Sequence, residues 1–331
     1  MATSGRLARA FVFCFIVMCV ATLFALSTGY QPIEWSQLQT DEIARTIFFR
    51  LRAPRVVLGL LVGGSLAGVG AALQALFRNP LASPFTLGVS GGGALGASVA
   101  IALGFGANIA GIPLVFIFAF AGSIAFVAIV YRLASAGTVV MPGTLLLAGV
   151  VLNLIAGAGV LMIQFVTDYT RALQILRWMV GSLDVIGMDL VWRMLIFLVP
   201  GMAFLLSTTR DLHLIAMDEE SAAALGVNVR RVERSVYAAS SLVVGVSVAV
   251  AGPIGFVGLI VPHAVRLLFG EDLRIVIPCS ILLGAAFLVL ADAFARSLLG
   301  ASELPVGAVT ALIGGPLFLM LLSHRRRYAA I

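Results

Sequence analysis

The stretch that decides the fold covers residues 79–131 and reads NPLASPFTLGVSGGGALGASVAIALGFGANIAGIPLVFIFAFAGSIAFVAIVY. It holds 53 consecutive residues without Asp, Glu, Lys or Arg. A single helix of that length would extend about 80 Å, whereas the hydrocarbon core of a bilayer is about 30 Å thick. The stretch therefore predicts two membrane-spanning helices, with the break between Gly104 and Pro113, where glycines and a proline gather.

Seven further uncharged runs lie on either side of this stretch, and a span needs roughly 20 apolar residues. The run 235–265 contains Gly252-Pro253-Ile254-Gly255, and proline inside a helix clashes with the preceding turn, so we divide this run in two. The sequence predicts an all-α polytopic membrane protein that forms one transmembrane domain over residues 1–331. The ten expected helices are 7–28, 54–77, 85–104, 113–133, 143–166, 189–208, 234–252, 255–269, 275–297 and 305–323.

The composition agrees with a membrane protein and excludes several kinds of chemistry. Hydrophobic residues make up 61% of the chain and charged residues 11%, against about 25% charged in soluble domains. All 21 basic residues are arginine, so the chain has no P-loop lysine and no Schiff-base lysine. Its three histidines and three cysteines match no zinc, haem or disulfide framework. We therefore expect no catalytic residue, no metal site and no bound cofactor, and we interpret the net charge of +6 as membrane topology rather than nucleic-acid binding.

The arginines give the orientation in the bilayer, because cytoplasmic loops carry an excess of positive charge. With both termini cytoplasmic, and the first helix retained as a signal anchor, thirteen arginines fall inside and eight outside. The inside positions are 6, 9, 78, 132, 210, 230, 231, 234, 266, 274, 325, 326 and 327; the outside positions are 45, 50, 52, 55, 171, 177, 193 and 296. Four of the eight lie in one patch from Arg45 to Arg55. Two interpretations stay open for this patch: snorkelling toward lipid headgroups, or docking of an acidic external partner.

Glycines and a few polar residues characterise the interior of the expected helices. Closely spaced glycines such as Gly63, Gly64 and Gly68 allow helices to approach closely, which predicts a close-packed bundle. Asn153 and Gln164 are eleven residues apart and therefore fall within about 20° of one helix face. This polar stripe is typical of a water-lined pathway or of interhelical hydrogen bonds, and the sequence leaves both open.

The longest charged interval runs from Arg210 to Arg234 on the expected cytoplasmic side. Acidic residues at 218–220 suit the start of a short helix, Gly226 suits a left-handed C-terminal cap, and Asn228 can cap the next helix. The pattern predicts a short amphipathic helix at about 217–227. Because its acidic face would be repelled by anionic headgroups, a protein partner explains it better than the membrane surface.

Several local motifs, taken in order, resemble one family. They are LRAPRV (51–56), QALFRNPLA (74–82), LGVSG (87–91), LLAG (146–149), RWMVGS (177–182), ALG (224–226), GPIGFVGLIVPH (252–263), AD (291–292) and ELPVG (303–307). The chain is similar, from about residue 45 to 323, to permease subunits of the FecCD type. These are the membrane subunits of binding-protein-dependent ABC importers for iron-siderophores, haem and cobalamin.

The resemblance implies a transport subunit of the bacterial inner membrane that is not itself an enzyme. It implies ten helices per subunit, a homodimer in the lipid bilayer with the pathway on its dyad, and one external substrate-binding protein. Two separate cytoplasmic ATPase subunits would use ATP and Mg, which makes the missing lysine harmless. The cargo expected first is an Fe(III)-siderophore, followed by haem and then cobalamin.

The resemblance also implies roles for particular residues. The docking arginines of the family match Arg52, Arg55 and Arg296. The interval from Asp218 to Gly226 is similar to the coupling helix that contacts the ATPase, and its expected contact residues are Asp218, Glu219, Glu220, Ala223, Leu225 and Gly226. Residues Asn79, Pro80 and Leu81 are similar to the loop that narrows the cytoplasmic exit, with the segment from Thr138 to Thr144 facing it. Thr144, Asn153 and Gln164 complete the expected gate and pathway.

Two other classes of protein remain as alternatives. A secondary active transporter of a small solute would need coupling-ion groups near the bilayer midplane, and the sequence places almost no carboxylate there. A membrane-embedded enzyme would need a Cys, His, Asp or Glu constellation or a G-x-S-x-G motif, and none is present. The importer subunit is therefore the leading hypothesis.

Overall fold

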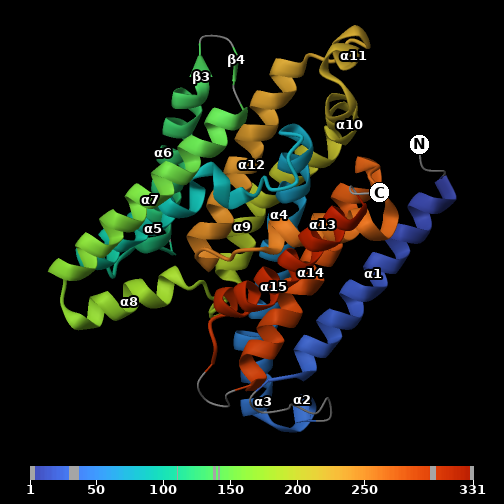
Figure 1. Ribbon diagram of the computed structural model, residues 1–331. Helices are drawn as coiled ribbons and strands as arrows, with labels where there is room; N and C mark the ends of the chain where they lie inside the picture. Colours follow the sequence, from blue (N-terminus) through green and yellow to red (C-terminus); the bar gives the residue numbers. More distant parts are fainter. Residues whose placement is uncertain are drawn as a thin grey trace.

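The computed structural model describes residues 4–29, 37–109, 111–136, 139–140, 142–298 and 303–328, and this part of the chain is almost entirely helical (Figure 1). Its helices are α1 (Ser4–Ser27), α2 (Gln37–Thr40), α3 (Glu42–Thr46), the π-helical turn η1 (Ile47–Arg52), α4 (Ala53–Leu76), the 3-10 turn η2 (Pro84–Leu87), α5 (Val89–Ala102), α6 (Leu114–Ala134), α7 (Pro142–Val166), α8 (Tyr169–Met179), α9 (Asp189–Ser207), α10 (Thr209–Met217), α11 (Glu219–Ala224), α12 (Val229–Ala251), α13 (Val257–Phe269), α14 (Leu273–Leu298) and α15 (Val306–Tyr328).

The polytopic all-helical class is confirmed, and each of the ten expected ranges overlaps one helix. Seven helical segments are long and apolar enough to cross a bilayer: Gly5–Ser27, Glu42–Leu76, Leu114–Ala134, Gly143–Val166, Asp189–Ser207, Val229–Ala251 and Leu273–Leu298. Three further apolar helices are shorter: Val89–Ala102, Val257–Phe269 and Val306–Met320. The count of ten spans therefore stays a prediction.

The interruptions between helices lie where the glycines and prolines of the sequence predicted them. Between α5 and α6 lies a small antiparallel hairpin of β1 (Asn108–Ile109) and β2 (Ile112–Pro113), which pairs Ile109 with Ile112. The second break separates α12 from α13, and Gly252 adopts φ +69 there, a left-handed value that side chains disfavour. A second hairpin, β3 (Ser135–Ala136) with β4 (Val139–Val140), joins α6 to α7.

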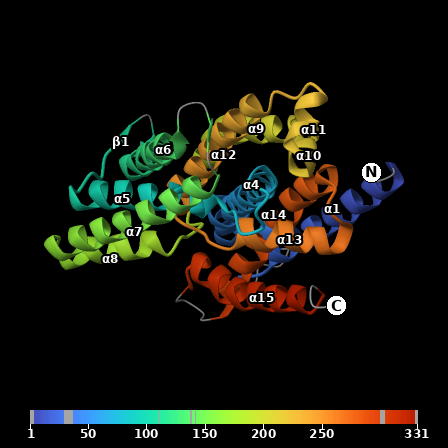
Figure 2. The ribbon, with the colours of Figure 1, turned by 45° about the horizontal axis from the view of Figure 1, so that its top comes forward.

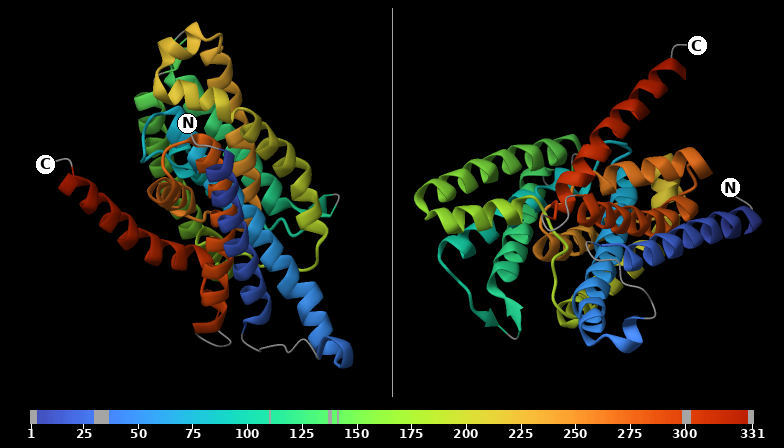
Figure 3. Two further views of the ribbon diagram at one scale, coloured as in Figure 1. Left: turned by 90° about the vertical axis from the view of Figure 1, so that its right-hand side faces the viewer. Right: turned by 90° about the horizontal axis from the view of Figure 1, so that it is seen from below.

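Helix α4 is the centre of the bundle. About 83% of its most apolar window is buried, against 17% for α7, and α9, α12, α13 and α14 pack around it. Figure 2 shows α5 to α8 on one side of α4 and α1 on the other. Helix α15 extends away from the rest of the bundle (Figure 3). The apolar faces of α7 and α15 are consequently exposed, with Leu154 and Leu312 among the most open side chains.

The glycines allow backbones to approach without intervening side chains, as predicted. A Cβ atom added at Gly63 of α4 would lie 2.3 Å from the carbonyl oxygen of Gly284 in α14. A Cβ atom at Gly92 of α5 would lie 2.3 Å from the carbonyl oxygen of Gly122 in α6. These distances confirm the close-packed glycine-rich bundle.

Four helical segments have no counterpart among the expected ranges: α2, the stretch formed by α3 and η1, α8 and α10. The helix expected from residue 54 is continued toward its N-terminus by η1 and α3, and the N–H of Ala53 donates to Phe48 O, five residues earlier. The wider π-turn accommodates Pro54, which lacks an N–H. Helices α8 and α10 are short and lie between apolar runs. They contain charged residues, so no uncharged run of sequence indicated them.

Candidate functional site

An ion-pair network forms at one end of the bundle, opposite to α10 and α11 (Figure 1). Its centre is Arg55 of α4, whose side chain binds carboxylates from three other parts of the chain. Arg55 Nη2 lies 2.9 Å from Asp292 Oδ1, and Arg55 Nη1 lies 2.8 Å from Asp184 Oδ1 and 2.5 Å from Glu303 Oε2. Asp292 also accepts from Arg296 Nε at 2.9 Å. We call Arg52, Arg55, Arg296, Asp184, Asp292 and Glu303 the outer cluster.

The other two arginines of the outer cluster hold the C-terminal end of α1. Arg52 Nη1 donates to Leu26 O at 3.1 Å, and Arg296 Nη2 donates to Ala25 O at 3.2 Å. Cations suit this position because the last carbonyl groups of a helix lack partners and carry partial negative charge. Both arginines are buried, with 6% and 5% of their surface exposed. They therefore attach α1 to η1 and to α14.

The structure brings Arg52, Arg55 and Arg296 together, as expected of a shared site. The three arginines differ in the groups that they bind. A cavity of about 430 Å³ opens beside them and is also lined by Asp184 and Glu303. Two of the carboxylates that Arg55 binds, Asp184 and Glu303, reach the surface. Asp292 and Arg296 lie four residues apart on α14, and their 2.9 Å contact neutralises both charges.

At the opposite end, α11 lies within the range 217–227 that was expected to form a short helix, and α10, which was not expected, precedes it. Asp218 caps α11 by accepting from Ser221 N at 2.8 Å. The hydrogen bond from the Ser221 side chain, followed by that from its backbone and by the charge of Arg78, lowers the pKa of Asp218 below its ordinary value. The cap is therefore ionised at neutral pH, where it suits the positive end of the helix.

The surface of this segment is suited to a protein contact. Met217 and Leu225 are 74% and 70% exposed, while Ala222 is fully buried against the bundle. Gly226 ends α11 with φ +88, as its C-cap position predicts. Asn228 then caps α12 by accepting from Arg231 N at 3.1 Å. Glu219, Glu220 and Ala223 are exposed beside the two apolar side chains.

The expected exit loop leaves the C-terminal end of α4 and lies against this segment. Arg78 adopts φ +45 and pairs with Glu219, the first residue of α11. Asn79 closes a tight turn by accepting from Leu81 N at 2.9 Å, and Leu81 is half exposed. A single ion pair thus connects the loop proposed to narrow the exit with the segment proposed to contact the ATPase.

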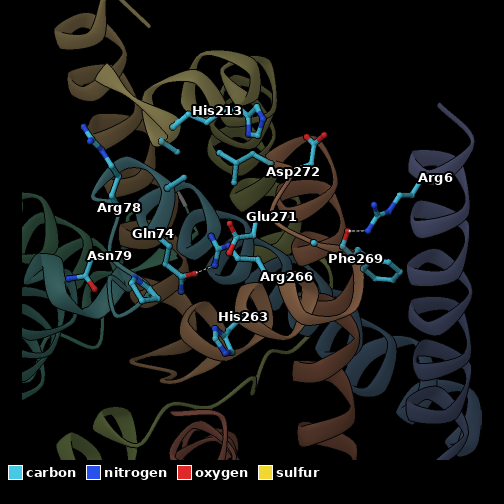
Figure 4. A pocket seen from close by; sticks show the side chains of 16 residues that line it. Arg6, Gln74, Arg78, Asn79, His213, His263, Arg266, Phe269, Glu271 and Asp272 are labelled. Atoms are coloured by element: carbon cyan, nitrogen blue, oxygen red, sulfur yellow. Dashed lines mark hydrogen bonds between the residues drawn. The ribbon is translucent and has the colours of Figure 1, made fainter. Parts of the chain in front are cut away.

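A polar cavity of about 570 Å³ lies beside the exit loop. Figure 4 shows side chains from α1, the end of α4, α10, α13 and the start of α14 around it. Gln74 accepts from Arg266 Nη1 and donates to Leu259 O at 3.2 Å, and Arg6 donates to Phe269 O at 2.8 Å (Figure 4). The Arg6 bond connects α1 to α13, and the Gln74 bonds connect α4 to α13.

Asn153 and Gln164, the two residues of the polar stripe on α7, differ in their hydrogen bonds. Asn153 accepts from Gly91 N at 3.0 Å and donates to Phe85 O at 2.8 Å, so its amide forms interhelical hydrogen bonds. Gln164 differs, because its Nε2 atom is buried without a hydrogen-bond partner. Thr144 is exposed near the N-terminal end of α7, while Thr138, from the segment expected to face the exit loop, lies outside the described residues.

Sequence reasoning did not find Asp184, Glu303, Gln74 or Arg266. Asp184 lies in the segment between α8 and α9, and Glu303 lies in the segment before α15, and nothing in their spacing connects them to Arg55. The i,i+4 spacing of Asp292 and Arg296 was the available signal for the outer cluster, because it placed one carboxylate beside an arginine on α14.

Comparison with known proteins matches the FecCD transport family over residues 14–324. The chain belongs to the FecCD transport family. It is 43% identical, over 91% of this chain and 79% of the relative, to the cobalamin import system permease protein BtuC of Halobacterium salinarum. It is 36% identical, over 92% of this chain and 91% of the relative, to the hemin transport system permease protein HmuU of Yersinia pestis.

Solved structures extend the FecCD match to three dimensions. An inward-facing ABC transporter of the metal-chelate type superposes with a TM-score of 0.84 at 31% identity, covering 96% of this chain and 99% of the other. PsaBC from Streptococcus pneumoniae superposes with a TM-score of 0.55 at 16% identity, covering 86% of this chain and 92% of the other, and this likeness concerns the fold alone. The suspected FecCD resemblance is therefore confirmed.

Proposed function

We propose that this chain is the permease subunit of an ATP-driven ABC importer that moves a large iron chelate into the cytoplasm. Its FecCD membership and its relatives named for haem and cobalamin import support a cargo of this size class. An Fe(III)-siderophore is the cargo we rank first, haem second and cobalamin third. The observation that carries the proposal is the layout with two ends: a cluster of arginines and carboxylates at one end and an exposed coupling segment at the other.

The importer works as an assembly in this proposal. Two copies of the chain form a homodimer whose shared surface encloses the pathway, and two ATPase subunits bind the α10–α11 segments. The ATPases bind ATP and Mg, so the permease itself carries no catalytic residue and no cofactor. Both termini lie in the cytoplasm, and the membrane is the bacterial inner membrane.

A substrate-binding protein docks on the outer cluster. Arg52, Arg55 and Arg296 are the proposed docking arginines, and all three are largely buried. Arg55, whose side chain is 12% exposed, makes the contact because it holds two carboxylates, Asp184 and Glu303, that reach the surface. Acidic groups on the docked protein would form charge-assisted hydrogen bonds with its guanidinium. Coupling is assigned to Asp218, Glu219, Glu220, Ala223, Leu225 and Gly226, and the gate and pathway to Asn79, Pro80, Leu81, Thr144, Asn153 and Gln164.

A secondary transporter is disfavoured by where the buried carboxylate lies. Coupling ions bind near the bilayer midplane in secondary transporters. Asp292 is buried near the C-terminal end of α14, and both Arg55 and Arg296 bind it. A carboxylate neutralised by two arginines offers no free acceptor to a sodium ion or a proton.

Reconstitution into proteoliposomes tests the proposal. The permease, its two ATPases and its binding protein are assembled, and uptake of an 55Fe-siderophore, haem and cyanocobalamin is measured with ATP inside. We expect accumulation of one of these cargoes with ATP and none with a non-hydrolysable analogue. An ATPase variant without its P-loop lysine is the matched control. Accumulation driven by an ion gradient without ATP would overturn the importer proposal.

A further inference from the structure

The outer cluster carries no net charge. Its three arginines are balanced by three carboxylates, and all three carboxylates contact Arg55. An acidic partner that approaches this end therefore meets a guanidinium whose three nitrogen atoms each already contact a carboxylate. Docking through Arg55 requires one of the resident carboxylates to leave.

The three carboxylates are not equally fixed. Asp292 has a side chain only 2% exposed and is held by both Arg55 and Arg296. Asp184 and Glu303, which we call the rim carboxylates, have side chains 65% and 42% exposed. They come from the segment between α8 and α9 and from the segment before α15, so they are attached to the cluster from outside the helical core.

The rim carboxylates share one atom of Arg55. Asp184 and Glu303 both bind Nη1, at 2.8 and 2.5 Å, while Asp292 binds Nε and Nη2. Nη1 is thus the edge of the guanidinium that faces the exposed groups. A carboxylate from an external protein would reach Arg55 at this edge.

We propose that Asp184 and Glu303 compete with carboxylates of the substrate-binding protein for Arg55, so that docking is an exchange of acidic partners. The inference rests on the docking role proposed above for Arg55. Each rim contact has one exposed partner, so the rim carboxylates exchange more readily than Asp292, which is buried, stays in place and keeps the arginine oriented.

The exchange predicts that neutralising a rim carboxylate strengthens docking. Neutralising a carboxylate that contacts the partner directly would weaken docking instead. Neutralising a rim carboxylate frees Nη1 and leaves the cluster with one net positive charge, which attracts an acidic partner. We expect Asp184→Asn and Glu303→Gln each to tighten docking by about two- to fivefold, with a larger gain in the double variant. The gain should shrink as salt increases, because the charges are partly exposed.

The experiment measures the dissociation constant of the binding protein for the complete permease–ATPase complex in nanodiscs, by biolayer interferometry at two salt concentrations. Glu42→Gln is the matched control, because it removes one exposed negative charge from α3, at the same end and outside the outer cluster. Arg55→Ala tests the docking role itself. Each variant is first checked for monodisperse elution and basal ATP hydrolysis, which shows that the complex is folded.

The outcomes separate the two proposals. Tighter docking by the rim variants, together with weaker docking by Arg55→Ala and no change in Glu42→Gln, supports the exchange. If Arg55→Ala weakens docking but the rim variants bind equally well or more weakly, the exchange is overturned while the docking role stands. If Arg55→Ala binds normally, both proposals fail.

Discussion

At the scale of single residues, the stability of the bundle depends on contacts between particular glycines. The sequence shows where the glycines lie in the chain but not which of them touch. Sequence reasoning predicted that glycine faces would pack closely, but not which glycine meets which helix, because that depends on the rotation of each helix about its axis. In the structure, Gly70 of α4 faces Gly258 of α13, and the two backbones touch. This contact lies where the central helix meets the irregular segment after Gly252.

Gly70→Ala should destabilise the protein strongly. The new Cβ atom would lie 1.9 Å from the carbonyl oxygen of Gly258, so the backbones of α4 and α13 must separate. Overpacking a well-packed core costs about 1–3 kcal/mol, and a backbone obstacle favours the upper end. The measurement is the thermal midpoint by fluorescence-detected size-exclusion chromatography.

Gly157→Ala is the matched control for this change. It lies within α7, and a Cβ atom there meets no atom within 4 Å, so we expect its thermal midpoint to stay at or slightly above that of the unchanged protein. Equal midpoints for the two variants would show that the α4–α13 contact does not limit stability.

The charged residues of the outer cluster show what sequence reasoning can and cannot reach at this scale. The pair Asp292 and Arg296 was predictable because four residues on one helix determine their separation. Asp184 and Glu303 are 129 and 248 positions away from Arg55 in the chain. No local rule connects them, and only the packed bundle brings them to one guanidinium.

At the scale of elements, uncharged length located the seven long apolar segments and the three shorter apolar helices, because desolvating a charge inside a bilayer is costly. The same criterion passed over α8 and α10, since short amphipathic helices at the membrane boundary carry charges. It also missed the helical turns before Pro54, where Gly187 N donates to Arg50 O, the carbonyl group that the missing N–H of Pro54 leaves without a helical partner. The coupling segment was found by different evidence, namely its caps at Asp218 and Gly226.

The ion pair between Arg78 and Glu219 predicts how the elements communicate. It joins the end of α4 to the start of α11, so movement of the coupling segment reaches the exit loop through it. Arg78→Glu and Glu219→Arg should each lower the ratio of cargo transported to ATP hydrolysed, by about two- to fivefold, because an exposed pair contributes about 0.2–1 kcal/mol. Combining both changes restores opposite charges and should restore most of the ratio.

Proteoliposomes loaded with ATP give both quantities in one assay of this pair. Arg9→Glu serves as control, because it reverses an exposed charge on α1 at the same end, away from the coupling segment. A double variant no better than either single variant would show that the pair does not transmit the movement.

At the scale of the whole molecule, arginines that the sequence assigned to opposite sides of the membrane gather in two separate groups. Arg6, Arg78 and Arg266 line one cavity beside the exit loop, whereas Arg52, Arg55 and Arg296 meet in the outer cluster. Excess positive charge is retained on the cytoplasmic side during insertion. The end that carries α10, α11 and the N-terminus of α1 (Figure 1) is therefore predicted to face the cytoplasm.

Cysteine labelling in cells tests this orientation for the whole bundle at once. In a chain whose Cys14, Cys19 and Cys279 are replaced by alanine, a single cysteine is introduced as Ile186→Cys, beside the outer cluster, or as Leu225→Cys, at the end of α11. Both positions are more than two-thirds exposed, at 78% and 70%, so access by the reagent depends on the side of the membrane. Expression without the ATPases keeps the second position uncovered.

A membrane-impermeant maleimide should label Ile186→Cys in intact spheroplasts and leave Leu225→Cys unlabelled until the membrane is permeabilised. The cysteine-free chain measures background. Labelling of Leu225→Cys in intact spheroplasts would show that the molecule has the opposite orientation. The outer cluster would then lie on the cytoplasmic side, where no external binding protein could reach it. The docking and coupling proposals assign their partners to opposite sides of the membrane, so this one result bears on both. If the labelling agrees with the predicted orientation, docking is tested by the binding assay and coupling by the transport assay.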